Sequence, residues 1–177
     1  MKTRLSLSLL LVPILVLSFL FVRPTTQVSA DGMTILKLGT MVGTPKAYTG
    51  AQNPIRGING GGLPWVISSA QGRLAASGML TIEVKGLVLD PNDPTVISRG
   101  LADQNPIASF RAIVSCKTID GGTMNVMTDP FPATTGLASM GGGNAQVVTT
   151  VSLPHPCIAP IIFVTSPGGA WFATTGY

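Results

Sequence analysis

The 177-residue chain carries 11 Lys and Arg against 7 Asp and Glu, and 45% of its residues are hydrophobic. Lys2, Arg4 and Arg23 lie near the start, which leaves eight cations against the seven acids in residues 31–177. Nucleic-acid binding requires a basic patch, and these eight cations are scattered singly along the sequence, so we expect no nucleic-acid partner.

The first 30 residues have the pattern of a secretory leader. Two cations precede an apolar run from Leu5 to Val22, and the small residues Val28-Ser29-Ala30 match a signal-peptidase site. We therefore expect a signal peptide over residues 1–30 and a single domain over residues 31–177. The expected location is secreted, either extracellular or in the cell envelope.

An uncleaved membrane anchor is the alternative interpretation of the leader. Its run of about 18 apolar residues is at the lower limit for a helix that spans a bilayer. Pro13 within the run and a cleavage site that follows Arg23 both favour cleavage. No second long apolar run follows, so we expect no membrane span in the mature chain.

Beyond the leader, the composition is typical of an all-β domain. All 21 glycines and 12 of the 14 prolines lie after residue 30, so turns should be frequent and helices short. Strand-like segments recur about every ten residues, which favours an antiparallel β-sandwich, Ig-like or jelly-roll, of about nine strands. In chain order, the expected strand segments are Thr34–Leu38, Leu63–Ser68, Arg73–Ala76, Met79–Leu89, Ile107–Lys117, Thr123–Thr128, Thr134–Met140, Ala145–Leu153, Ile158–Thr165 and Ala170–Thr175.

The clearest local pattern is a hairpin over residues 73–89. In its second strand Leu80, Ile82 and Val84 alternate with polar residues, which predicts one buried and one exposed face. Gly78 supplies the positive φ that a tight turn needs.

Cys116 and Cys157 are the only cysteines. An even pair in an exported chain is usually bridged, so we expect one disulfide between them. It would tie a central strand to the rigid Pro154-His155-Pro156 segment, and the chain-entropy model assigns about 4 kcal/mol to closing a loop of about forty residues. Two buried free thiols are the alternative.

The polar stretch 90–106 should be a loop with room for one helical turn. Its residues Asp90, Asn92 and Asp93 are a candidate Ca²⁺ site, although Pro94 occupies the third ligand position of an EF-hand. Turn formation next to a proline is the alternative interpretation of the same residues. Beyond this candidate, we expect no metal and no cofactor.

The sequence offers no catalytic constellation that can be named. His155 is the only histidine, and no serine lies in a Gly-x-Ser-x-Gly elbow. Glu83 lies on the polar face of its strand beside Lys85, which indicates a solvated pair rather than a catalytic carboxylate. We therefore expect no catalytic residue.

Aromatic residues are the candidates for ligand binding. Trp65, Trp171 and the C-terminal Tyr177 could contact a sugar or a small ligand. Both tryptophans lie within apolar strand segments, so packing in the core is the alternative role.

Several segments resemble a group of uncharacterised exported bacterial all-β proteins of about 150 mature residues. The resemblance spans most of the mature chain, and no activity is assigned to the group, so it implies a fold and no site residue. The segments that carry it are Arg56-Gly57-Ile58-Asn59-Gly60-Gly61-Gly62-Leu63-Pro64-Trp65, Phe110-Arg111-Ala112-Ile113-Val114-Ser115-Cys116, Leu153-Pro154-His155-Pro156-Cys157-Ile158-Ala159-Pro160 and Gly169-Ala170-Trp171-Phe172-Ala173-Thr174-Thr175-Gly176.

These observations favour a secreted, non-catalytic β-sandwich that acts as a structural or interaction module with an unknown extracellular or cell-surface partner. A module that binds carbohydrate or another small ligand is the second hypothesis, and a hydrolase is the third.

Overall fold

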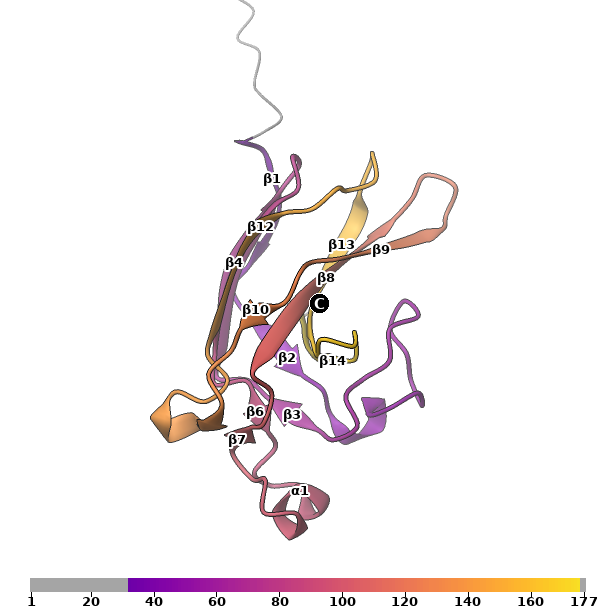
Figure 1. Ribbon diagram of the computed structural model, residues 1–177. Helices are drawn as coiled ribbons and strands as arrows, with labels where there is room; N and C mark the ends of the chain where they lie inside the picture. Colours follow the sequence, from indigo (N-terminus) through magenta and orange to yellow (C-terminus); the bar gives the residue numbers. More distant parts are fainter. Residues whose placement is uncertain (1–31, 176–177) are drawn as a thin grey trace, which may run out of the picture.

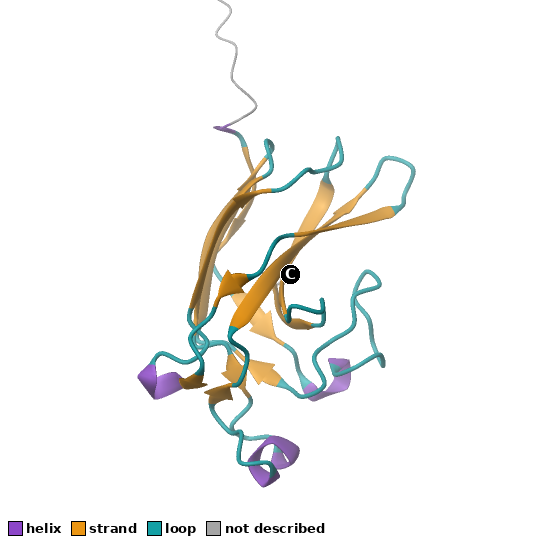
Figure 2. Ribbon diagram, viewed as in Figure 1, coloured by secondary structure: helices purple, strands orange, loops and turns teal. Residues whose placement is uncertain are grey.

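The computed structural model describes residues 32–175, which form antiparallel β-sheets with short helical turns between them (Figures 1 and 2). The expected signal peptide over residues 1–30 and the candidate Tyr177 lie outside the described residues. The strands are β1 (Thr34–Leu38), β2 (Met41–Gly43), β3 (Trp65–Val66), β4 (Ser69–Ala75), β5 (Met79–Lys85), β6 (Val88–Leu89), β7 (Gln104–Asn105), β8 (Ser109–Lys117), β9 (Thr123–Met127), β10 (Phe131–Pro132), β11 (Gly136–Leu137), β12 (Ala145–Thr150), β13 (Ile158–Thr165) and β14 (Trp171–Thr175). The helical segments are η2 (Lys46–Tyr48), α1 (Pro94–Ser98) and η3 (Ala138–Met140).

Two larger sheets form the body of the domain. The four-stranded sheet has the order β1-β4-β5-β12, and the six-stranded sheet has the order β10-β8-β13-β14-β2, with β9 also paired to β8. Two small sheets, β11-β7 and β3-β6, lie at the end of the molecule near α1 (Figure 1). Every strand pair is antiparallel.

One hydrophobic core joins the two larger sheets. Leu80 and Ile82 of β5 are at most 1% exposed, and they belong to the same buried cluster as Phe110 and Val114 of β8. Figure 1 shows the two sheets facing each other across this cluster. Because full burial of one large apolar side chain contributes about 1.5–3 kcal/mol, this shared core is the main stabilising contact between the sheets.

The expected hairpin is confirmed as β4 and β5. Gly78 has a φ of 87° in its turn, and a Cβ there would lie 1.9 Å from the carbonyl oxygen of Val151. The Val151 N–H in turn donates to the Gly78 carbonyl over 3.0 Å. Glycine is therefore required at this position both by its backbone conformation and by the close approach of the chain that follows β12.

The expected number of about nine strands is too low, because fourteen are present in residues 32–175. Five of these have only two residues, and so short a strand shows no alternation of side chains. The strand expected over 134–140 is wrong: it contains only β11, followed by a 3₁₀ turn. Pro132, which falls between two of the expected strand segments, lies in the edge strand β10, where a missing N–H is tolerated.

The disulfide between Cys116 and Cys157 is confirmed, with the two Cα atoms 5.0 Å apart. It links β8 to the segment that leads into its neighbour β13. Within residues 32–175, no helix is long and apolar enough to cross a membrane.

A like-charge pair on the outer face of the four-stranded sheet yields a stability prediction. Lys37 of β1 is directly opposite Arg73 of β4, and both side chains are exposed. Like charges at such positions destabilise a sheet and opposite charges stabilise it, so Lys37→Glu should raise the free energy of unfolding by about 0.2–1 kcal/mol. Urea denaturation measures the change.

The gain from Lys37→Glu should shrink in about 1 M NaCl, because salt screens exposed charges. Lys37→Gln, which only removes the repulsion, should give a smaller gain at low salt. A loss of stability in Lys37→Glu, or a gain that is insensitive to salt, would contradict the electrostatic explanation.

Candidate functional site

A hollow of about 310 Å³ opens at the end of the molecule near α1. We call it the aromatic hollow. Its volume is at the lower limit for small-molecule sites, and most of its lining is apolar. The lining residues are Gly62, Leu63, Trp65, Leu89, Arg99, Leu101, Pro106, Ile107 and Phe172.

Two stacked aromatic rings form part of the wall of the aromatic hollow. Trp65 of β3 and Phe172 of β14 have ring centroids 4.0 Å apart and an interplanar angle of 25°. Phe110 meets Phe172 edge-on at 5.9 Å and connects the pair to the main core. Trp65 is only 4% exposed: most of the residue packs in the core and the remainder lines the hollow, while its role in ligand binding stays a prediction.

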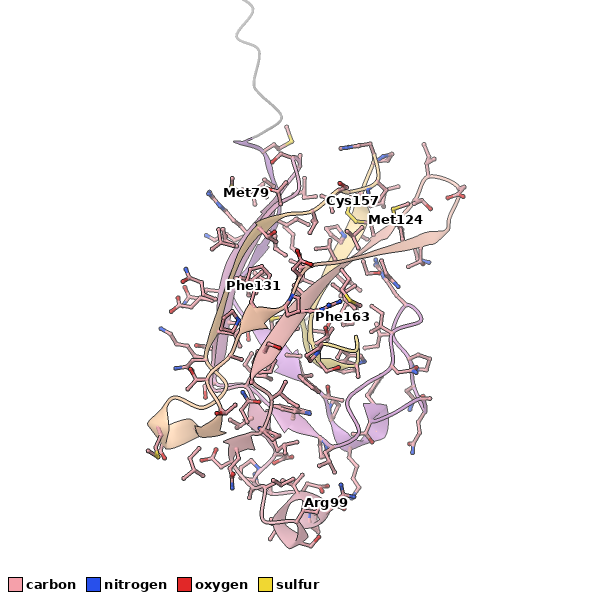
Figure 3. The ribbon with its side chains drawn as sticks, in the orientation of Figure 1. Met79, Arg99, Met124, Phe131, Cys157 and Phe163 are labelled. Carbon is pink, nitrogen blue, oxygen red and sulfur yellow. A yellow bond between two sulfur atoms is a disulfide. The ribbon has the colours of Figure 1, made fainter. Side chains whose placement is uncertain are left out.

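Arg99 is the charged residue in the lining of the aromatic hollow. It is the C-cap residue of α1, its side chain is exposed, and it lies at the end of the molecule away from Cys157 (Figure 3). The two ion pairs of the described chain involve Lys46 and Lys85, so the Arg99 guanidinium is unpaired within residues 32–175. A guanidinium beside apolar surface can bind a carboxylate or another oxyanion through paired hydrogen bonds.

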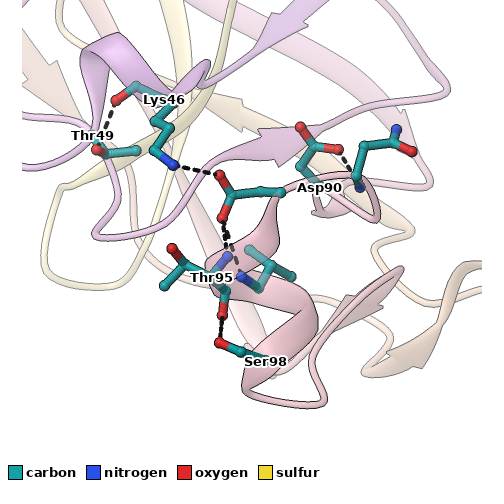
Figure 4. Close-up of polar contacts among 8 residues, drawn as sticks. Lys46, Thr49, Asp90, Thr95 and Ser98 are labelled. Atoms are coloured by element: carbon teal, nitrogen blue, oxygen red, sulfur yellow. Dashed lines mark hydrogen bonds and ion pairs between the residues drawn. The ribbon is translucent and has the colours of Figure 1, made fainter.

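The position of Arg99 depends on the capping of α1 by Asp93 (Figure 4). Oδ1 of Asp93 accepts the N–H groups of Thr95 at 2.8 Å and Val96 at 3.1 Å. Its Oδ2 lies 3.2 Å from the Nζ atom of Lys46. This one buried carboxylate therefore begins the helix and connects it to the segment before β3.

The candidate Ca²⁺ residues are used by the local structure. Oδ1 of Asp90 accepts the N–H of Asn92 at 2.9 Å, which forms an Asx turn. Both carboxylate oxygens of Asp93 already have donors. Among residues 32–175, no group of three or more His, Cys, Asp or Glu side chains could hold a metal ion.

Trp171 lies in a second buried cluster, on the opposite face of the six-stranded sheet from the main core. It is 1% exposed and packs with Ile58, Ile113 and Phe163, and with Tyr48 at a ring-centroid distance of 6.1 Å. It therefore has the packing role that was the alternative to ligand binding.

The cover over this outer face is residues 44–62, which we call the strap. Gly61 N–H donates to the Trp171 carbonyl at 2.8 Å, and Trp171 N–H donates to the Asn59 carbonyl at 2.9 Å. A Cβ on Gly61 would lie 2.9 Å from the Phe172 ring, so the strap can pass this close only as glycine.

Arg56 fastens the middle of the strap. Its Nη1 donates to the Ser115 carbonyl at 2.8 Å and its Nη2 to the Ala159 carbonyl at 2.7 Å. Asn125 Nδ2 donates back to the Arg56 carbonyl at 3.0 Å. No local pattern marks Arg56 or Arg99, because the carbonyls that Arg56 contacts and most of the apolar residues around Arg99 are distant along the chain.

His155 is exposed beside the disulfide, at a hollow of about 200 Å³. The lining there is Ile35, Ala76, Leu153, Pro154, His155, Pro156 and Cys157, which supplies neither a nucleophile nor a carboxylate partner for the imidazole. Glu83 is exposed and lies 2.9 Å from the Nζ atom of Lys85, the surface pair that its alternation indicated.

Comparison with protein-family models, curated proteins and solved structures finds no match to this chain.

The Asp93 cap predicts a pH-dependent contribution to stability. Burial of the carboxyl opposes its ionisation, but hydrogen bonds from Val96, Lys46 and Thr95 outweigh burial, and the pKa of Asp93 is lowered from 3.8. Its stabilising effect is then complete above pH 3.8 and is lost as the pH falls through the lower pKa of the folded state.

Accordingly, Asp93→Ala should lower Tm at neutral pH, and its difference from the wild type should shrink as acid protonates the Asp93 carboxylate. Asp93→Asn keeps a capping side chain but loses the charge, so it should be less damaging at neutral pH. Thermal unfolding followed across the pH range measures both variants. A difference that grows on acidification would show that the sign is wrong.

The strap predicts a second stability effect. Arg56→Ala removes two charge-assisted hydrogen bonds, so we expect a loss of about 1–3 kcal/mol. It should also cause faster proteolysis within residues 44–62. Arg99→Ala, which removes an exposed arginine with no ion pair in the described chain, is the matched control. Equal effects of the two variants on strap proteolysis would contradict the fastening role of Arg56.

Proposed function

We propose that this chain is an exported, non-catalytic interaction module with a β-sandwich architecture, Ig-like or jelly-roll, and that it binds a small amphipathic anion in the aromatic hollow. The core shared by two antiparallel sheets supports the sandwich. The Cys116–Cys157 disulfide is compatible with an extracellular location, and the leader-like residues 1–30 support export.

The observation that carries the proposal is an unpaired guanidinium at an open apolar hollow. Leu63, Leu101 and Ile107 offer apolar contact, and Arg99 offers two parallel N–H donors to a carboxylate. A ligand with a short apolar chain and a carboxylate satisfies both parts of this lining. No other charged residue lines the hollow, so a cationic ligand would meet only the repulsion of Arg99.

The same geometry argues against carbohydrate at this position. Sugar rings bind to the open faces of aromatic side chains, whereas one face of Trp65 is stacked on Phe172 and the whole residue is 4% exposed. An apolar chain needs only the edges of these rings.

Octanoate, octanol and octylammonium distinguish the two parts of the proposed site, because they share one chain and differ in charge. We expect octanoate to bind most tightly, with a change in tryptophan fluorescence as Trp65 is covered. Arg99→Gln should weaken octanoate binding by about tenfold or more, because a hydrogen bond to a charged group contributes about 1.5–3 kcal/mol and 1.4 kcal/mol corresponds to tenfold, and it should leave octanol unchanged.

Lys117→Gln, on the distant hairpin of β8 and β9, is the matched control for charge removal. Isothermal titration calorimetry gives the three affinities for each variant. Octylammonium that binds as tightly as octanoate, or an Arg99→Gln variant with unchanged octanoate affinity, would overturn the proposal.

A further inference from the structure

A second hollow, of about 370 Å³, lies between the strap and the outer face of the six-stranded sheet. We call it the strap hollow. It is separate from the aromatic hollow, since the two share no lining residue. Its lining is Gly57, Ile58 and Asn59 of the strap, Ile113, Asn125 and Met127 of the sheet, and Gly168, Gly169 and Ala170 of the turn between β13 and β14.

Unpartnered polar atoms belong to residues that neighbour the lining of the strap hollow. Within residues 32–175, the buried side-chain atoms without a hydrogen-bond partner are Arg111 Nε, Ser115 Oγ and Trp171 Nε1. Arg111 and Ser115 flank Ile113 on the outer face of β8, and Trp171 packs in the same cluster as Ile113. Ser115 is 0% exposed and Trp171 is 1% exposed.

Buried polar groups are nearly always satisfied, so each exception requires an explanation. Within residues 32–175, each exception belongs to a neighbour of a lining residue, Ile113 or Ala170, although none of the three is itself in the lining. Burial without a partner costs stability. The wall behind the strap hollow therefore carries polar groups that the fold leaves unused.

The lining itself indicates the chemical class of ligand. Asn59 of the strap contributes an amide that can donate and accept. Nδ2 of Asn125 already donates to the Arg56 carbonyl, so Asn125 offers the hollow its Oδ1 as an acceptor. Ile113 and Met127 are directly opposite each other on β8 and β9 and provide an apolar floor. No charged side chain is part of the lining.

Met127 is held in place at this floor. Its Sδ accepts a hydrogen bond from Nη1 of Arg111 at 3.0 Å. Its methyl group lies 3.0 Å from the position that a Cβ of Gly169 would occupy, so the glycine turn packs directly on it. The Met127 methyl therefore reports on any molecule that enters between the turn and the strap.

We propose that the strap hollow binds a single uncharged sugar unit, with the ring hydroxyls on Asn59 and on Oδ1 of Asn125 and an apolar ring face on the exposed Met127. A sugar ring combines vicinal donors and acceptors with a C–H face, which matches two amides over an apolar floor. A carboxylate-bearing ligand would find no charged partner in this lining. The site does not depend on the ligand of the aromatic hollow.

The test uses the folded full chain with ¹³C-methyl methionine. Glucose, galactose and N-acetylglucosamine are titrated separately, and the Met127 methyl signal is assigned with Met127→Leu. We expect at least one sugar to shift the Met127 signal saturably, with half-saturation at about 10 mM or below, while the buried Met41 signal stays fixed.

Asn59→Ala is the decisive variant. Within the described chain the Asn59 side chain makes no hydrogen bond that the fold needs, and the substitution keeps the Asn59 carbonyl that accepts the Trp171 N–H. It should abolish the shift. Gln146→Ala removes an exposed amide from the other sheet and Arg99→Gln alters the aromatic hollow, and both should leave the shift unchanged.

No Met127 shift with any of the three sugars, or a shift that persists in Asn59→Ala, would overturn this proposal. So would equal shifts at the exposed Met124, which does not line the hollow. Because octanoate binding is read at Arg99, failure here leaves the proposed function standing, and failure there leaves this site standing.

Discussion

The domain depends on the burial of β8 on both of its faces. Phe110, Ala112, Val114 and Cys116 are each 0% exposed and point into the core between the sheets. The residues between them point outward, and Ile113 is nevertheless 3% exposed because the strap covers it. A strand that is half-buried in a two-layer domain is here buried on both faces over residues 112–116, because a third layer of chain covers its outer face.

This double burial determines where the two hollows lie. The strap cannot fill the whole outer face, and the space that remains beside β9 is the strap hollow. Near α1, the strap passes under Phe172 as glycine and continues into Trp65, and the aromatic hollow opens beside them. Both candidate sites therefore border the strap. Arg56 holds the strap at one point, and the Lys46–Asp93 ion pair holds it at another.

Alternation of apolar and polar residues was sufficient to predict the long strands, because it is a local pattern. The number of cysteines alone was sufficient to predict the disulfide. Thr34–Leu38 agrees with β1 residue for residue. Alternation did not predict the short strand that contains Pro132, because that strand depends on pairing with Ser109 of β8. In the sequence Lys37 and Arg73 are separate, single charges, although strand pairing places them directly opposite each other.

The candidate sites were less predictable than the fold. In the structure, Trp65 lies at a hollow and Trp171 lies in a packed cluster. This difference depends on which segment of the chain covers each ring. The strap has no periodic pattern because its contacts are made by backbone groups, glycines, one arginine and irregularly spaced apolar side chains such as Tyr48 and Ile58. Nothing in the local sequence of Arg56 indicates that its partners are the carbonyls of Ser115 and Ala159.

Native-state hydrogen exchange tests most directly whether β8 is the doubly buried centre of the domain. The amides of β8 and its neighbour β13 should exchange last, only through global unfolding, while those of β9 and the strap exchange earlier through local opening. Exchange from the middle of β8 as fast as from β9 would show that the strap and the core do not protect the strand together, and the account would fail.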